Sequence, residues 1–82
     1  MTIYKISNHV HYSNFELVDG TGLYNYEFTE YVDIILVNIN NPKKRKRITI
    51  KTSEFNPFDY KIGYRYQITK FLWFEKWTWL QP

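Results

Sequence analysis

Five consecutive positively charged side chains are the feature of this sequence with the clearest chemistry. They follow an Asn-Asn-Pro segment that favours a turn, and they are Lys43, Lys44, Arg45, Lys46 and Arg47. Charges this close repel one another unless water surrounds them or an anion binds them. Phosphate backbones are the commonest such anion, and each phosphate contact makes binding more sensitive to salt. This basic cluster therefore predicts phosphate binding at a loop.

Aromatic side chains in the last third of the chain are candidate surfaces for stacking bases. Proteins that bind single strands combine a positive groove, which follows the backbone, with rings on which bases stack for about 1–3 kcal/mol each. The candidate rings are Tyr64, Tyr66, Trp73, Trp77 and Trp79. Further cations that would extend the basic cluster are Lys51, Lys61 and Arg65. Together they predict a nucleic-acid surface if cations and rings share one side of the fold.

Both features also have an ordinary structural interpretation. A basic run between two strands is often a solvated loop, and most tyrosines and tryptophans in so small a domain form its core. Solvent exposure of Trp73, Trp77 and Trp79 decides between the two interpretations.

Other chemistry has little support in the sequence. His9 and His11 are two residues apart and would share one face of a strand, yet no third metal ligand is found near them. The chain has no cysteine nucleophile and no glycine-rich phosphate loop, and nothing in the sequence indicates that Glu27 and Asp33 form an acid–base pair. We therefore expect no enzyme, no metal site and no cofactor.

Charge is unevenly distributed along the chain. Residues 6–42 contain five acidic residues and no Lys or Arg, whereas residues 43–82 contain ten basic residues and three acidic ones. Such a chain presents one negative and one positive surface. The abundance of Trp, Tyr and Arg is also typical of protein interfaces. A second hypothesis is therefore a small phage- or mobile-element-encoded inhibitor or accessory factor that binds a host protein, and a third is a homo-oligomer.

Composition predicts a small domain rich in strands. The 82 residues are 21% aromatic and include no Cys and no Ala. The core must therefore depend on packing alone, and β-branched and aromatic residues favour strands. No apolar run is long enough to span a bilayer, and the N-terminus lacks the pattern of a signal peptide. We expect one domain over residues 1–82 with no membrane partner, located in the cytoplasm, or in the host cytoplasm if the protein is viral.

Alternation of apolar and polar residues predicts the strands. Residues 31–39 predict a central strand with Val32, Ile34 and Leu36 on one face and Ile35, Val37 and Ile39 on the other. Residues 47–52 predict a half-exposed strand whose isoleucines face inward. Further strands are expected at 2–12, 14–18, 23–30 and 61–69, and in the first of these Ile6, Val10 and Tyr12 are expected to share a face.

Turn residues divide these strands. Asp19-Gly20-Thr21-Gly22 predicts a hairpin turn, and Gly63 predicts a bulge or sharp bend. Pro57 predicts a loop or one short helical turn near residues 54–60. Residues 71–80 fit either a strand or a helix, and their aromatic content favours the strand.

The predicted fold is all-β, a small five- or six-stranded barrel of the oligonucleotide-binding or SH3 type, because closure hides the edges of a sheet. The predicted function is binding of nucleic acid without sequence specificity, with a preference for single strands. The alternative is the protein-binding module described above.

Overall fold

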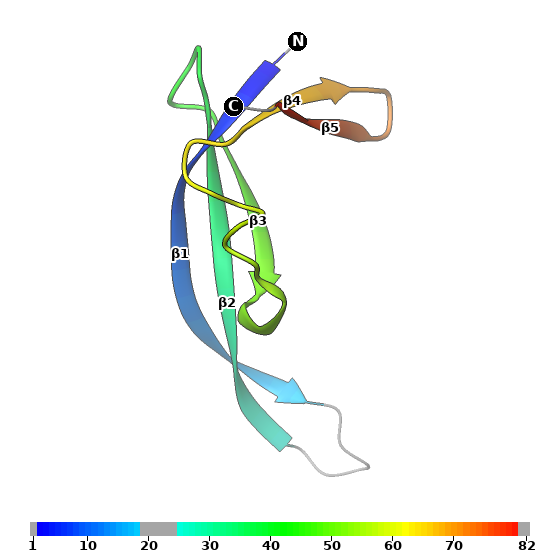
Figure 1. The fold of residues 1–82 in the computed structure, drawn as a ribbon. Helices are drawn as coiled ribbons and strands as arrows, with labels where there is room; N and C mark the ends of the chain where they lie inside the picture. The colour runs from blue at the N-terminus through cyan, green and yellow to red at the C-terminus, as the bar shows by residue number, and fades with distance from the viewer. Residues whose placement is uncertain (1, 19–24, 81–82) are drawn as a thin grey trace.

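The described residues form five antiparallel strands, which confirms the all-β prediction. The computed structural model describes residues 2–18 and 25–80, so the predicted turn at residues 19–22 lies outside the described part of the chain. The strands are β1 (Thr2–Val18), β2 (Asn25–Asn38), β3 (Arg45–Lys51), β4 (Arg65–Lys70) and β5 (Glu75–Leu80), and a 3-10 turn, η1, spans Thr52–Glu54 (Figure 1).

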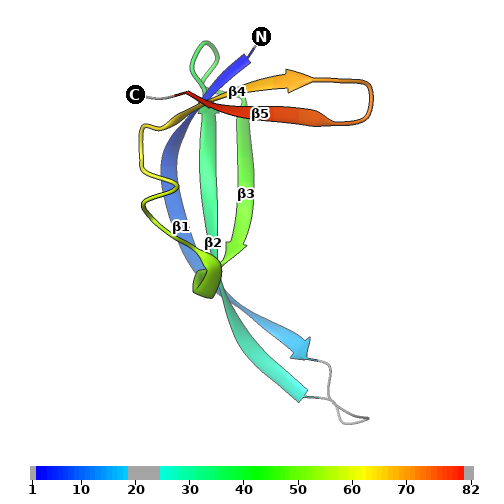
Figure 2. The same ribbon diagram turned by 45° about the vertical axis from the view of Figure 1, so that its right-hand side comes forward.

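The sheet is open, so the predicted barrel is not confirmed. Its strand order is β3-β2-β1-β4-β5, and within the described residues no strand pairing joins the edge strands β3 and β5. β4 pairs with β1 only over Thr2–Lys5. The short β4–β5 hairpin therefore lies across one end of the longer β1–β2–β3 sheet instead of running beside it (Figure 2).

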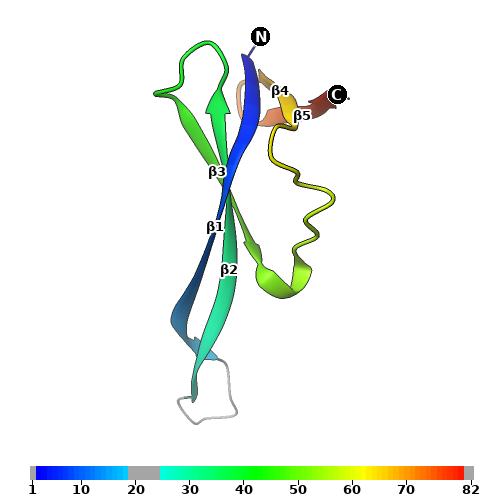
Figure 3. The same ribbon diagram turned by 60° about the vertical axis from the view of Figure 1, so that its left-hand side comes forward.

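β1 and β2 are longer than predicted. The expected strands at 2–12 and 14–18 are one strand, and those at 23–30 and 31–39 also join, with 23–24 outside the described residues. β3 ends opposite Tyr31, so residues 13–18 and 25–30 extend beyond the other strands as a two-stranded ribbon, here named the arm (Figure 3). The radius of gyration is 16.0 Å, against about 12 Å for a compact chain of this length.

A β-bulge between Ile6 and Asn8 changes which side chains of β1 share a face. One extra residue reverses the alternation along the rest of the strand. Ile6 therefore shares its face with His9 and His11, and the prediction that grouped Ile6 with Val10 and Tyr12 is wrong. We name the face that carries Ile6 the inner face and the opposite one the outer face.

The core lies on the inner face, covered by the β3–β4 connection and the β4–β5 hairpin. Its buried apolar residues are Tyr4, Ile6, Val32, Ile34, Leu36 and Ile68. Partly buried residues pack around them, namely Ile48, Ile50, Phe55, Tyr60, Tyr64, Tyr66 and Trp77. The predicted inward side of β3 is thus confirmed. In β2, the face of Val32, Ile34 and Leu36 is the buried one, since Ile35 and Val37 are left partly exposed on the outer face.

In the connection from β3 to β4, the helical turn and the start of the next strand lie at other residues than predicted. The helical turn is η1, which overlaps the predicted 54–60 only at Glu54. The predicted strand at 61–69 begins only at Arg65, because Gly63 bends the chain with a φ of 96° that favours glycine. The Gly63 N–H donates to the Ile6 carbonyl at 2.8 Å. The predicted bend at Gly63 is therefore confirmed.

Residues 71–80 form a turn and a strand, so the helical alternative is wrong. The Phe71 N–H donates to the Phe74 carbonyl at 2.8 Å and closes the β4–β5 turn. β5 then pairs with β4 so that Trp77 lies opposite Ile68 and Trp79 opposite Tyr66. Both tryptophans consequently face the inner side.

Candidate nucleic-acid interface

The alternation of β3 divides the basic cluster between two faces of the sheet. Successive side chains of a strand point to opposite faces. Lys46 lies on the inner face with Ile48 and Ile50, whereas Arg45 and Arg47 lie on the outer face. The two remaining cations, Lys43 and Lys44, lie exposed in the loop before β3.

The outer-face cations form a group of their own. Arg45, Lys5 and Arg65 stand in one row across the sheet, since Arg45 is opposite Val37, Val37 opposite Lys5, and Lys5 opposite Arg65. Lys51 also lies on this face, at the end of β3. These cations are therefore separated by the sheet from any ring on the inner face.

Arg47 is partly neutralised on that outer face. Its Nη1 lies 3.6 Å from Oδ2 of the buried Asp33. The hydroxyls of Tyr12 and Thr49 also donate to Asp33, at 3.1 and 2.8 Å. Arg47 therefore helps to balance a buried carboxylate, and less of its charge remains for an anion.

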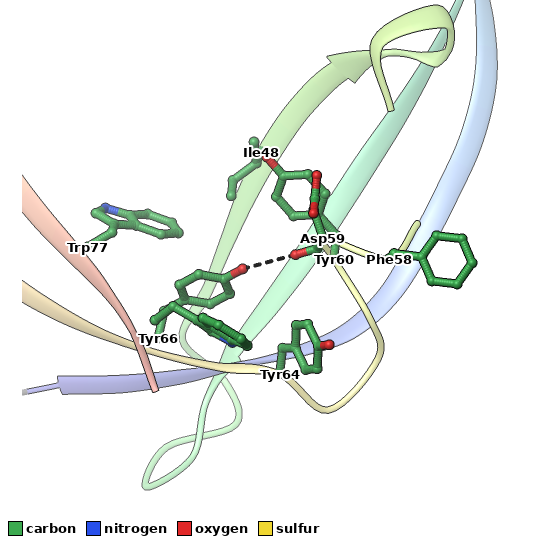
Figure 4. A pocket seen from close by; sticks show the side chains of 8 residues that line it. Ile48, Phe58, Asp59, Tyr60, Tyr64, Tyr66 and Trp77 are labelled. Atoms are coloured by element: carbon green, nitrogen blue, oxygen red, sulfur yellow. Dashed lines mark hydrogen bonds between the residues drawn. The ribbon is translucent and has the colours of Figure 1, made fainter. Parts of the chain in front are cut away.

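The predicted rings Tyr64, Tyr66 and Trp77 gather on the inner face. With Trp79 they line the aromatic groove, a cavity of about 470 Å³ whose other lining residues are Ile48, Phe58, Asp59 and Tyr60 (Figure 4). The centroids of Tyr64 and Trp79 are 5.4 Å apart, and those of Tyr66 and Trp77 are 6.2 Å apart. The groove thus offers several ring faces to one ligand.

The Tyr66 hydroxyl is held inside the aromatic groove. It donates to the Asp59 carbonyl at 3.4 Å, a contact shown in Figure 4. Burial, with smaller effects of Tyr60 and Asp59, raises the pKa of this phenol above its ordinary value of 10.0. Tyr66 therefore stays neutral at physiological pH.

Lys44 and Lys46 lie beside a second cavity, here named the basic groove. It measures about 450 Å³ and is lined by Thr2, Tyr4, Asn38, Lys44, Lys46, Ile68, Thr69, Lys70 and Glu75. Three lysines from three segments meet there: Lys44 from the loop, Lys46 from β3 and Lys70 from β4. Sequence reasoning missed Lys70, whose position depends on how β4 crosses the sheet.

The two grooves share a wall made by Lys46, Glu75 and Trp77. Lys46 Nζ donates to Glu75 Oε1 at 2.8 Å and to Oε2 at 3.1 Å, and the Trp77 indole N–H donates to Oε2 at 3.2 Å. Lys46 Nζ also lies 6.0 Å from the Trp77 ring centroid. The wall places a cationic surface directly beside an aromatic one.

The hydrogen bond from Lys46, and then that from Trp77, lowers the pKa of Glu75 below its ordinary value of 4.5. A lowered folded-state pKa means that the pair stabilises the fold above pH 4.5 and that this contribution is lost as pH falls through the lowered pKa. We expect the urea midpoints of the wild type and Glu75→Gln to differ at neutral pH and to converge in acid. A difference that does not change with pH would contradict this role of Glu75.

The β4–β5 turn carries the most exposed apolar side chains of the described chain. Leu72 is 95% exposed and Trp73 is 82% exposed. The rings of Phe71 and Phe74, on either side of them in the chain, stack at 4.6 Å. Trp73 is therefore free for contact with a ligand, unlike the half-buried Trp77.

Both histidines contact residues of the β3–β4 connection. The rings of His9 and His11 are nearly perpendicular to the Phe55 ring, at centroid distances of 5.3 and 6.2 Å, and His9 Nε2 hydrogen-bonds with the Tyr60 carbonyl. Within residues 2–18 and 25–80, His, Cys, Asp and Glu form no group of three that could hold a metal ion. No helix in this part of the chain has the length and apolar character to cross a membrane.

The structure therefore brings Lys44, Lys46, Tyr64, Tyr66 and Trp77 to adjoining grooves and leaves Arg45, Arg47, Lys51 and Arg65 on the outer face. Lys43 lies in the loop next to Lys44, and Trp73 in the β4–β5 turn.

Comparisons with protein-family models, with curated proteins and with solved structures find no match to this chain.

Proposed function

We propose that the protein binds single-stranded nucleic acid without sequence specificity, along the two adjoining grooves. Phosphates lie on Lys44, Lys46 and Lys70 in the basic groove, and bases stack on rings of the aromatic groove. The observation that carries the proposal is the shared wall, in which Lys46 and Trp77 contact the same carboxylate. A strand crossing this wall meets a cation and a ring within one nucleotide step.

The strand order supports the same proposal. Lys46 of β3 and Glu75 of β5 form an ion pair, so the two edge strands of the open sheet lie close together on the inner side. We infer a partly open relative of the oligonucleotide-binding barrel, a fold that binds strands at its second and third strands and at the loop between its fourth and fifth. The basic groove lies between the corresponding elements here.

Salt dependence tests the proposal. Three phosphate contacts on a single strand give a slope of log K against log salt of about −2. We expect fluorescence anisotropy with a labelled oligonucleotide of mixed sequence to give this slope. Absence of binding at low salt, or binding that salt does not weaken, would show that the grooves do not hold phosphates.

Glu75 provides a variant that should bind more tightly. Glu75→Gln removes the carboxylate that competes with a phosphate for Lys46, so the affinity should rise about fivefold. Glu54→Gln is the matched control, because Glu54 is exposed in η1 and lines neither groove. An equal rise in both variants would assign the effect to net charge alone.

A second candidate function is protein binding through the β4–β5 turn. Tryptophan is enriched among the residues that dominate interfaces, and the exposed Trp73 lies beside the exposed Leu72 in this turn. A stoichiometric protein partner that survives nuclease treatment, and that Trp73→Ser no longer binds, would favour this function over the first.

A further inference from the structure

The arm carries an exposed apolar face. Phe15 pairs with Phe28 and Leu17 with Tyr26, so all four side chains project from the inner face of β1 and β2. Each is between 54% and 74% exposed. The Phe15 ring stacks on Tyr26 at 5.0 Å and contacts Phe28 at 5.1 Å. The rings thus already form one continuous surface within a single copy.

The opposite face of the arm is acidic and polar. Glu16 lies directly opposite Glu27, and Asn14 directly opposite Thr29. Glu16 also accepts a hydrogen bond from the Tyr31 hydroxyl at 2.8 Å. The two carboxylates disfavour a nucleic acid as the occupant of the arm, and they leave the apolar face as the surface that needs cover.

Exposure of this face is physically costly. A two-stranded ribbon without a third strand or a covering layer is marginally stable in water. Three rings of about 200 Å² each and one leucine, at these exposures, present roughly 500 Å² of apolar surface. A patch of that size reaches the range of the largest patches on monomeric proteins, which are often functional.

We propose that the arms of two copies pack face to face and form a symmetric dimer. Two such patches together remove roughly 1,000 Å² of apolar surface from water, about the least that a specific interface buries. A two-fold axis places the same patch on both sides, which suits a surface without strong charge at its centre. Glu16 and Glu27 then point away from the other copy, and Glu30, which shares the inner face, lies opposite Ser13 at the base of the arm, outside the four apolar side chains.

The dimer leaves the two grooves free. The arm and the β4–β5 hairpin lie at opposite ends of a molecule 49 Å long (Figure 1). Pairing through the arms therefore gives two groove pairs, one at each end of the assembly. This consequence rests on the proposed function, and it predicts tighter binding of oligonucleotides long enough to reach both ends.

Sedimentation equilibrium without nucleic acid tests the dimer. We expect the wild type to reach twice the mass of one chain as its concentration rises, and Phe28→Ser to self-associate at least tenfold more weakly. Phe58→Ser is the matched control, because Phe58 is 72% exposed, close to the 74% of Phe28, and lies outside the arm. Phe58→Ser should dimerise like the wild type. Circular dichroism should show the same strand content in all three proteins.

Three outcomes would overturn the dimer: a wild type that stays monomeric, a Phe28→Ser variant that dimerises as strongly as the wild type, or a Phe58→Ser variant that loses the dimer. The Phe15→Ser variant provides a second check on the same surface, since Phe15 contacts both neighbouring rings. A monomer that still binds an oligonucleotide overturns the dimer alone, whereas a dimer that binds none overturns only the proposed function.

Discussion

Reversing the charge of Lys44 and Lys70 together is expected to weaken oligonucleotide binding about 100-fold. Each substitution removes one phosphate contact and adds a repulsive carboxylate, and a tenfold loss for each corresponds to about 1.4 kcal/mol. The two side chains come from different segments and meet only at the basic groove. The dissociation constant of Lys44→Glu/Lys70→Glu, measured at low salt by fluorescence anisotropy, checks the prediction.

The matched control is Lys5→Glu/Lys51→Glu, which changes the net charge by the same amount on the outer face. It should weaken binding only a few-fold, through the long-range field of the protein. If this control loses as much affinity as the groove variant, phosphates bind to no particular face. If it loses more, the row of Lys5, Arg45 and Arg65 is the binding surface.

Shortening Ile34 should cause the largest loss of stability, about 3–4 kcal/mol. Ile34 is fully buried in β2 and lies between His9 of β1 and Ile48 of β3. Removal of buried methyl groups costs the transfer free energy and leaves a cavity. Since a small domain has a total stability of only about 5–15 kcal/mol, the Ile34→Ala midpoint in urea should fall sharply.

Ile35→Ala is the control for that variant. Ile35 is the next residue of β2, but it lies partly exposed on the outer face opposite Arg47. Its truncation should cost about 1 kcal/mol or less, since little apolar area is lost from the core. Equal losses for the two variants would contradict the assignment of the core to the inner face.

The strands that alternate most clearly were the ones the sequence predicted best. In β2, every second residue from Val32 to Leu36 is fully buried, and in β3 both isoleucines face inward. The wrong grouping of Ile6 with Val10 and Tyr12 on β1 has a single cause, the bulge between Ile6 and Asn8. A bulge depends on pairing with a partner strand, so the alternation of one strand alone does not reveal it.

Barrel closure could not be predicted from strand number. β4 and β5 have six residues each, and β1 has 17. Short strands can cover only one end of a long ribbon, so the sheet remains open and the arm extends beyond it. Tyr26 and Phe28 alternate with polar residues in the sequence, but what covers their face depends on the lengths of the neighbouring strands.

The candidate site was predicted in part. Alternation within Arg45-Lys46-Arg47 is enough to place Lys46 on the opposite face from its neighbours once β3 is known to begin at Arg45. The contact of Lys46 with Glu75 joins residues 29 positions apart. Such a pairing depends on the crossing of β4–β5 over β3, which no local pattern encodes.

The indole N–H signals of the three tryptophans report whether a nucleic-acid strand occupies the aromatic groove. In nuclear magnetic resonance spectra, addition of a single-stranded oligonucleotide should shift the signals of Trp77 and Trp79, which line the aromatic groove. Tryptophan-to-phenylalanine variants assign the three signals. If the oligonucleotide binds while the Trp77 and Trp79 signals stay in place, the strand lies elsewhere on the protein and the grooves are not its site.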